Sequence, residues 1–316
     1  MLAGLINLPN LYNPYEHLDY AQQRRDTVIN SMVSHGYLTE QQGNLAKSIK
    51  VEDLLMSAKE NPLAQVNQYQ AYIDTALQEA QELTGMDPML VGMDIYTAME
   101  PDVQSQIENI QNGRSVVQFF DEKLQTAVIS INNRNGEIIG IGAGRNYNGS
   151  MLFNRATSGY YQPGSTVNPF LSYALAFEYL GYTLDETVTD KPYLFEGRFI
   201  TNATNQYWGD LPLKKAVAYS INMPALYTLE KVLDKIGDDA VISYLNSLGF
   251  TQVNKDDFDI IYAIGGDSFT VTAEQLAAAH AAMINLGTYI EPHTIKRVQT
   301  TKYGTFEPAP ETRRVL

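Results

Sequence analysis

The segment QPGSTVNP, residues 162–169, joins a Pro-Gly turn to a run of apolar residues. Pro163 and Gly164 interrupt the preceding structure, and Ser165 stands where a helix is expected to begin. The apolar side chains that follow recur at helical spacing: Phe170, Leu171, Ala174, Leu175 and Phe177. We therefore expect Ser165 near the positive end of a buried helix, where backbone N–H groups stabilise negative charge on its oxygen.

Further polar residues are placed to work with Ser165. Asn168 follows it by one helical turn, so the two side chains are expected on the same face. Ser220 and Asn222 come after the helical segment 213–219 and just before a proline, which predicts a short loop between two helices. The residues alone leave a plainer alternative open for each motif, namely an N-cap serine and the polar end of a helix.

The composition limits the classes of function. The chain has 316 residues, 44% of them hydrophobic, which is enough for two modest domains with a buried core. A net charge of −14 argues against a nucleic-acid surface, which needs clustered Lys and Arg. Cysteine is absent, so disulfides and thiolate metal sites are excluded. We find no apolar run long enough to span a bilayer and no secretory signal at the start.

Three more features organise the chain. A helix is predicted from Leu18 to a glycine stop at Gly36, and Thr39 with Gln42 predicts a capping box for the next helix. A polar, Gln-rich helix is expected over 66–83, followed by a breaker that marks a boundary. Two antiparallel strands, 127–131 and 138–141, are predicted around Asn135-Gly136, which tolerates a tight turn.

The pair of motifs, S-x-x-N at 165–168 and S-x-N at 220–222, resembles the active site of penicillin-binding transpeptidases, whose signatures are S-x-x-K, S-x-N and K-T-G. The resemblance implies that Ser165 is the nucleophile of an acyl transfer and that Ser220 relays a proton. It also implies that Asn222 binds the peptide of the substrate, with Thr166 beside it. The partners implied are a peptidoglycan stem peptide or a β-lactam, and other cell-wall synthesis proteins.

Asn168 departs from the family pattern, because it stands where the family has the lysine that accepts the serine proton. A carboxamide has no nitrogen that titrates near neutral pH. Loss of a general base lowers rates by about 10²–10⁴. We therefore expect acylation of Ser165 to be strongly impaired. The competing hypothesis is a non-catalytic pseudo-transpeptidase that serves as a binding or scaffold module of the wall-synthesis machinery.

The resemblance extends beyond the two motifs. Residues 5–36 resemble the C-terminal end of the glycosyltransferase domain of class A penicillin-binding proteins, after its catalytic glutamates, so a remnant without that activity is implied. We expect an α+β transpeptidase domain of the β-lactamase-like type, with an incomplete antiparallel sheet and a small helical segment before it. The expected domains are 1–60 for the glycosyltransferase remnant, 61–120 for a linker helix and strand, and 121–316 for the transpeptidase domain.

The family's K-T-G strand is expected to lie beyond the last residue, because Lys302-Tyr303-Gly304-Thr305 is better interpreted as a turn between strands. With that strand missing, residues 1–316 alone are expected to be poorly stable or to aggregate. The resemblance implies a location on the extracytoplasmic face of a bacterial membrane.

We expect no cofactor and no metal. The histidines have no metal-ligand spacing: His17, His35, His280 and His293. His280, on an Ala-rich helix, is interpreted as a packed or edge residue rather than a metal ligand, and the acidic run at 256–259 as a solvated turn.

Overall fold

A computed structural model describes residues 12–15, 17–55, 68–266 and 268–316 of the chain. The chain divides into two compact units, Met1–Gln68 and Tyr69–Leu316.

The part of the first unit that the structure describes contains two helices and a short 3₁₀ turn. Its elements are α2 Leu18–Ser34, α3 Glu40–Ser48 and η1 Glu52–Leu54. The predicted stop of the first helix is confirmed, since Gly36 has φ = 77° directly after the C-cap residue. The predicted capping box is also present, because the Thr39 hydroxyl accepts from the Gln42 amide at 3.2 Å. Residues 5–11 of the glycosyltransferase-like stretch lie outside the described residues.

The second unit mixes helices with short strands. Its α-helices are α4 Gln70–Thr84, α5 Pro101–Gln111, α6 Ala174–Leu180, α7 Leu213–Ala218, α8 Asn222–Ile236, α9 Asp238–Ser247 and α10 Ala273–Ile284. Its other short helices are η3 Gly164–Val167, η4 Pro169–Tyr173 and η5 Ile260–Ile264. Its strands are β1 Met93–Thr97, β2 Val128–Ile131, β3 Ile138–Gly142, β4 Thr187–Asp190, β5 Tyr193–Phe195, β6 Arg198–Ile200, β7 Gly209–Pro212, β8 Thr288–Ile290, β9 Ile295–Thr300, β10 Gly304–Phe306 and β11 Thr312–Arg314.

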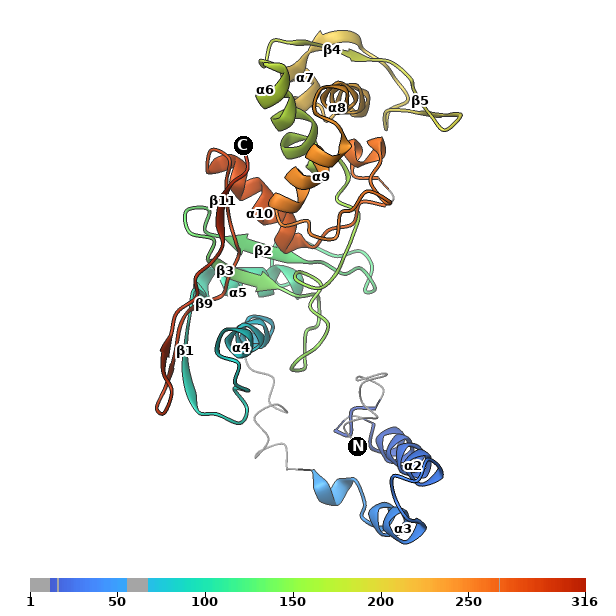
Figure 1. The fold of residues 1–316 in the computed structure, drawn as a ribbon, viewed down its shortest axis with the longest axis vertical. Coiled ribbons are helices and arrows are strands. Elements are labelled where there is room, and N and C mark those ends of the chain that lie inside the picture. The colour runs from blue at the N-terminus through green and yellow to red at the C-terminus, as the bar shows by residue number, and fades with distance from the viewer. Residues whose placement is uncertain (1–11, 16, 56–67, 267) are drawn as a thin grey trace. The chain divides into compact units, whose positions relative to one another are not determined.

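The strands form small antiparallel sheets (Figure 1). β1, β9 and β10 make a three-stranded sheet, while β2–β3, β4–β7, β5–β6 and β8–β11 are pairs. The predicted hairpin is confirmed as β2–β3, in which Ile129 pairs with Ile141. Its turn is wider than expected: the amides of Asn135 and Gly136 both bond to the Asn132 carbonyl, and of these only Gly136 has positive φ, at 76°. A glycine suffices for this loop, so the asparagine stays in an ordinary conformation.

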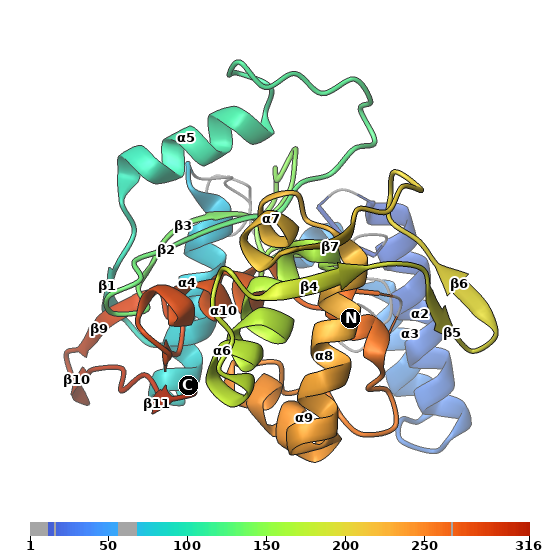
Figure 2. The same cartoon turned by 90° about the horizontal axis from the view of Figure 1, so that it is seen from above.

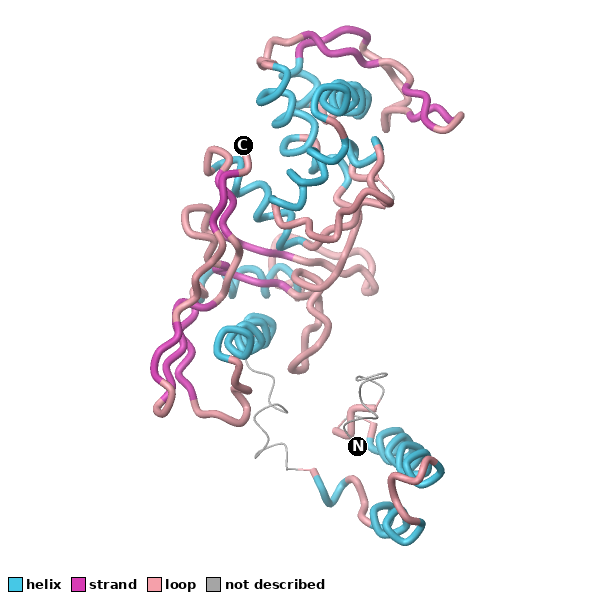
Figure 3. The backbone as a smooth tube through the Cα atoms, viewed as in Figure 1, coloured by secondary structure: helices cyan, strands magenta, loops and turns pink. Residues whose placement is uncertain are grey.

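Helices cover the β2–β3 hairpin from two sides. α10 contacts β2 while α4 contacts β3, and Figure 1 shows the two helices on opposite sides of the hairpin. The predicted 66–83 helix starts at Gln70, and its first predicted residues, 66 and 67, lie outside the described part. α4 is fixed to the sheet region because the buried Tyr72 hydroxyl donates to the Ile138 carbonyl at 2.6 Å. Figure 3 shows the strands β1, β9, β10 and β11 along one edge of the unit, and Figure 2 shows the same grouping from above.

The main hydrophobic core lies among the helices. It contains Val167, Phe170 and Leu171, which come from the QPGSTVNP segment and the helix after it, together with side chains of α8, α9 and α10.

Residues 302–305, the segment similar to K-T-G, lie where β9 turns into β10, so the interpretation of this segment as a turn is confirmed. The predicted α+β class with an incomplete antiparallel sheet and an N-terminal helical segment is confirmed as well.

Candidate active site

Ser165 lies in a tight turn that opens the buried helical segment. Gly164 has φ = 58°, and the Asn168 amide donates to the Ser165 carbonyl at 3.2 Å, which is 3₁₀ geometry. The segment then widens to a π-helical turn over η4, where the Tyr173 amide donates to the Asn168 carbonyl at 3.1 Å. The single regular helix expected here is therefore wrong in detail. Pro169 explains the difference, because it has no N–H to donate to Ser165 and forces the ladder to shift.

The helical segment that follows Ser165 is fixed by the packing of its buried side chains and by one hydrogen bond from α9. The side chains of Phe170, Leu171 and Leu175 are fully buried. The hydroxyl of Tyr244, on α9, donates to the Phe170 carbonyl at 2.6 Å. Because the π-turn leaves carbonyls without their usual partners, this bond satisfies a group that would otherwise be buried unpaired. Tyr244 was not singled out from the sequence.

A second glycine, Gly265, packs against the turn. Gly265, the residue after η5, has φ = 65°, and a Cβ added there would lie 2.6 Å from the Cα of Gly164. The two backbones therefore touch, and only glycine fits at position 265. This contact between the two backbones fixes the position of the turn that carries Ser165.

The structure brings Ser165 and Asn222 together. The Ser165 hydroxyl donates to Oδ1 of Asn222 at 3.2 Å, across 57 positions of sequence. Both side chains are half-buried. The Thr166 hydroxyl is exposed and donates back to the Pro163 carbonyl at 2.6 Å, so it helps to close the turn.

Ser220 is exposed, and among the described residues no hydrogen bond joins its hydroxyl to Ser165 or Asn168. It has φ = 51°, a left-handed conformation that an L-residue adopts at a penalty. Its amide donates to the Val217 carbonyl at 3.1 Å, and the Ile221 amide donates to the Ala216 carbonyl at 3.0 Å. This pair of bonds is the Schellman motif, in which glycine is the usual residue at the Ser220 position.

Replacing Ser220 with glycine is expected to stabilise the chain. Ser220→Gly relieves the left-handed strain and should raise the free energy of unfolding by about 1 kcal/mol. Denaturant unfolding followed by the fluorescence of Trp208, the single tryptophan, measures this effect. Ser220→Ala keeps the strain and is the matched control. Equal stability of Ser220→Gly and Ser220→Ala would contradict the strained geometry.

Asn168 is buried and lacks a partner. Its side chain is 4% exposed, and neither its Oδ1 nor its Nδ2 has a hydrogen-bond partner. The hydroxyls of Ser172 and Tyr173 nearby in the sequence are also buried and unpaired. Burial raises the pKa of the Tyr173 hydroxyl, and the neighbouring Asn168 amide opposes that shift without completing a good hydrogen bond. Position 168 is thus a polar residue in a place from which water is excluded.

His280 packs beneath the turn, as predicted. Its ring meets Phe170 edge-on at 5.4 Å, and its Nε2 lies 3.0 Å from the Thr166 carbonyl, an arrangement that requires the proton on Nε2. Burial lowers the pKa of His280, so the ring stays neutral at pH 7. Because its Nε2 already serves a carbonyl, this histidine braces the turn.

The described residues contain no group of three or more His, Asp or Glu side chains arranged to hold a metal ion. The acidic run is a capped turn: Asp257 accepts from the Asn254 side chain at 2.6 Å, and Asp259 accepts from the Ile261 amide at 2.7 Å. In the same described part of the chain, no helix is both long and apolar enough to cross a membrane.

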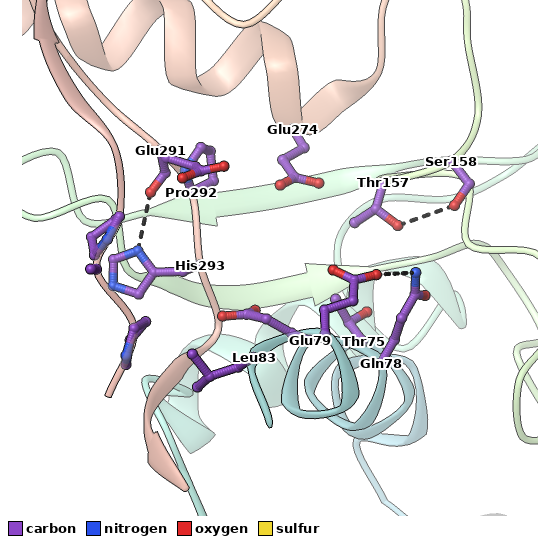
Figure 4. Close-up of a pocket in the computed structure, with 14 residues that line it drawn as sticks. Thr75, Gln78, Glu79, Leu83, Thr157, Ser158, Glu274, Glu291, Pro292 and His293 are labelled. Atoms are coloured by element: carbon purple, nitrogen blue, oxygen red, sulfur yellow. Dashed lines mark hydrogen bonds between the residues drawn. The ribbon is translucent and has the colours of Figure 1, made fainter. Parts of the chain in front are cut away.

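A separate acidic pocket of about 440 Å³ lies between α4 and the start of α10 (Figure 4). Glu274 extends into it from α10, with Glu79 and Glu291 on its other walls. Glu79 is already used structurally, because it accepts from the amides of Thr294 and Ile295 at 2.6 and 3.1 Å. Burial raises the pKa of the Glu274 carboxyl to about 7, and the charges of Glu79 and Glu291 add to the shift.

This pocket predicts a pH-dependent stability. Between about pH 4.5 and 7 the folded chain keeps Glu274 protonated while the unfolded chain does not, so folding takes up a proton. The free energy of unfolding should therefore fall as the pH rises through that window, by about 1–3 kcal/mol. Glu274→Gln should remove this fall and make the chain more stable than the wild type at pH 8. Denaturant melts at several pH values test it, with the exposed Glu307→Gln as control; identical pH profiles for Glu274→Gln and wild type would refute it.

Comparison with known proteins places the chain. Residues 126–316 match the family described as the penicillin binding protein transpeptidase domain. Penicillin-binding protein 1A/1B of Bacillus subtilis is 32% identical over 319 residues, which cover 100% of this chain and 34% of that protein. Penicillin-binding protein 1A of Streptococcus pneumoniae is 32% identical over 310 residues, covering 94% of this chain and 42% of its own length.

Solved structures agree on the fold. Penicillin-binding protein 1A from Haemophilus influenzae superposes with a TM-score of 0.63 at 19% identity and covers 98% of this chain and 59% of that one. PonA1 from Mycobacterium tuberculosis in complex with penicillin V gives a TM-score of 0.64 at 20% identity, covering 78% of this chain and 67% of that one.

The chain belongs to the penicillin-binding protein transpeptidase family. The predicted resemblance to class A penicillin-binding proteins is confirmed, because the match to penicillin-binding protein 1A/1B covers the whole length of this chain. The chain itself spans between 34% and 47% of the length of three curated relatives that are each 32% identical to it.

Proposed function

We propose that this chain carries the acylation half of a peptidoglycan D,D-transpeptidase, the half that reacts with the donor stem peptide, with Ser165 as a correctly placed but weakly activated nucleophile. The substrate class is a stem peptide ending in D-Ala-D-Ala, or a β-lactam that mimics it. The observation that carries the proposal is the 3.2 Å hydrogen bond from the Ser165 hydroxyl to Asn222, which joins the two motifs of the family in one place.

The roles of the residues follow from their positions. Ser165 attacks the carbonyl of the penultimate D-Ala, and its own backbone N–H serves as one donor to the oxyanion. The peptide C–N bond then breaks, the terminal D-Ala leaves with the serine proton on its amine, and the rest of the stem peptide stays on Ser165 as an ester. Asn222 offers its Nδ2 hydrogens to the peptide while its Oδ1 receives the serine hydroxyl. Ser220 and Thr166 are assigned to the rim, where both are exposed to an incoming substrate.

The weak step is removal of the serine proton. Of the described side chains, Asn222 is the one with a hydrogen bond to the Ser165 hydroxyl, and a carboxamide is not a base. Asn168, which stands at the lysine position of the family, is uncharged and buried. The acyl-enzyme complexes of imipenem and ceftriaxone solved for penicillin-binding protein A of M. tuberculosis support a β-lactam as the ligand class.

A second function, a binding module without turnover, is favoured by the same residue. The buried carboxamide of Asn168 leaves the recognition residues in place while removing the proton acceptor. Such a domain would hold stem peptides or wall-synthesis proteins outside the cytoplasmic membrane. The division into residues 1–60 (glycosyltransferase remnant), 61–120 (linker) and 121–316 (transpeptidase) remains part of this proposal.

Titration with an N-acyl-D-Ala-D-Ala peptide tests the proposal and separates the two functions. We expect the amide resonances of Ser165, Ser220 and Asn222 to shift on binding. Slow release of D-Ala that disappears in Ser165→Ala favours the weak enzyme; binding without release favours the module. No shift at any of the three amides would reject both.

A further inference from the structure

Asn202, in the loop between β6 and β7, reaches the Ser-x-Asn motif from a distance in sequence. Its side chain is 6% exposed. Oδ1 accepts from the backbone amide of Asn222 at 3.1 Å, and Nδ2 donates to Oδ1 of Asp190 at 2.7 Å and to the Gln206 carbonyl at 2.9 Å. Nδ2 faces two acceptors and Oδ1 faces one donor. A flip of the carboxamide would exchange Nδ2 with Oδ1 and would therefore break all three hydrogen bonds.

The bond to Asn222 does the work of a helix cap. Asn222 is the first residue of α8, and first-turn amides have no acceptor within the helix. The N-cap residue is Ile221, whose side chain cannot accept a hydrogen bond. Asn202, 20 positions earlier, supplies the missing acceptor. The start of α8, and with it the Asn222 side chain, is therefore set by a residue outside the motif.

Asp190 fixes Asn202 in turn. Its carboxylate, at the end of β4, is 1% exposed and has an acceptor role at both oxygens. Oδ1 receives Asn202 and Oδ2 receives the backbone amide of Trp208 at 2.8 Å. A buried carboxylate is stable only when it is hydrogen-bonded, and both of these donors come from the 202–208 loop. The loop is thus fastened to β4 on one side and to α8 on the other.

The same loop forms one wall of a pocket beside Ser220. The pocket has a volume of about 160 Å³ and is lined by Asn202, Trp208, Tyr219 and Ser220 among others. The Trp208 and Tyr219 rings lie 5.3 Å apart. A loop that moved away from Asp190 would change this wall and the start of α8 together.

We propose that Asp190 and Asn202 are positioning residues for the Ser165 site: the hydrogen-bond chain Asp190–Asn202–Asn222 holds the Asn222 side chain against the Ser165 hydroxyl. The proposal rests on the proposed function for the meaning of the Ser165–Asn222 contact. The chain of bonds itself needs no substrate to be tested.

Hydrogen exchange of backbone amides, measured by NMR on the unliganded chain, is the test. In the wild type, the Asn222 amide should exchange at least about tenfold more slowly than the Met223 amide, the next in the helix. Asn202→Ala should speed Asn222 exchange by about tenfold, and Asp190→Asn, which keeps the shape but loses an acceptor, by about threefold. Asn205→Gly, in the same loop at φ = 54°, is the control and should change nothing at Asn222.

A second readout separates positioning from general stability. The Asn222 side-chain amide resonance should move in Asn202→Ala by as much as it moves in Ser165→Ala, while the amides of Leu226 and Leu229 keep their exchange rates. If Asn202→Ala does not fold, Asp190→Asn and the wild-type comparison of Asn222 with Met223 still decide. Wild-type exchange at Asn222 as fast as at Met223, or unchanged Asn222 signals in both variants, would overturn the proposal. Absence of peptide binding, by contrast, would reject only the proposed function.

Discussion

Asn168→Lys is expected to raise the rate constant for acylation of Ser165 by a β-lactam by about 10²–10⁴. Position 168 follows Ser165 by one turn and is 4% exposed. Burial lowers the pKa of a lysine amine, so a fraction stays neutral and can accept the serine proton. Intact-protein mass spectrometry during incubation with benzylpenicillin gives the rate constant directly.

The control for this substitution is Asn168→Met, which has similar length and no amine. It should acylate no faster than the wild type, and the double variant Ser165→Ala/Asn168→Lys should not acylate at all. If Met and Lys at position 168 gave the same rate, the missing base would not be what limits this site.

Gly265→Ala is expected to destabilise the chain by about 4 kcal/mol, through overpacking and left-handed strain together. The added methyl would lie 2.6 Å from the Cα of Gly164, which is backbone and has no rotamer to change. The turn that carries Ser165 must therefore shift, so we also expect loss of the Ser165–Asn222 contact. Thermal melts and the Asn222 side-chain resonance measure the two effects.

Gly181→Ala is the matched control for this prediction. Gly181 ends α6 with φ = 66°, close to the value at Gly265, but nothing lies within 4 Å of a Cβ added there. Gly181→Ala should therefore lose about 1 kcal/mol, from strain alone. A loss at Gly265 no larger than that at Gly181 would show that the two backbones do not meet as described.

The sequence was most informative where local signals agree. The glycine stop at Gly36, the capping box at Thr39 and the β2–β3 hairpin were all predicted, because each depends on residues only a few positions apart. The meeting of Ser165 with Asn222 was expected from a family resemblance. Spacing alone could not have given it, since the two lie 57 positions apart.

The missed features depend on contacts between distant segments. Pro169 was visible in the sequence, yet its effect, a π-turn in place of a regular helix, depends on how Tyr244 satisfies the freed carbonyl. Asn202 sits in a polar loop with several other hydrogen-bonding residues, and no periodicity distinguishes it. Its importance appears only when Asp190 and Asn222 are seen on either side of it.

The raised pKa of Glu274 was likewise beyond prediction. In the sequence Glu274 looks like an ordinary acidic residue in the first turn of a helix, where the helix dipole would stabilise its negative charge. Its pKa depends on burial and on Glu79 and Glu291, which come from other parts of the chain. Its position in the folded chain therefore favours the neutral carboxyl, whereas the local sequence favours the charged one.

The central claim is that Ser165 is a positioned nucleophile without a base, and the labelling of the unaltered chain by penicillin tests it most directly. Incubated with excess fluorescent penicillin, the chain should gain label only over hours, and peptide mapping should find that label on Ser165. Complete, one-to-one labelling of Ser165 within the first minute would contradict the account.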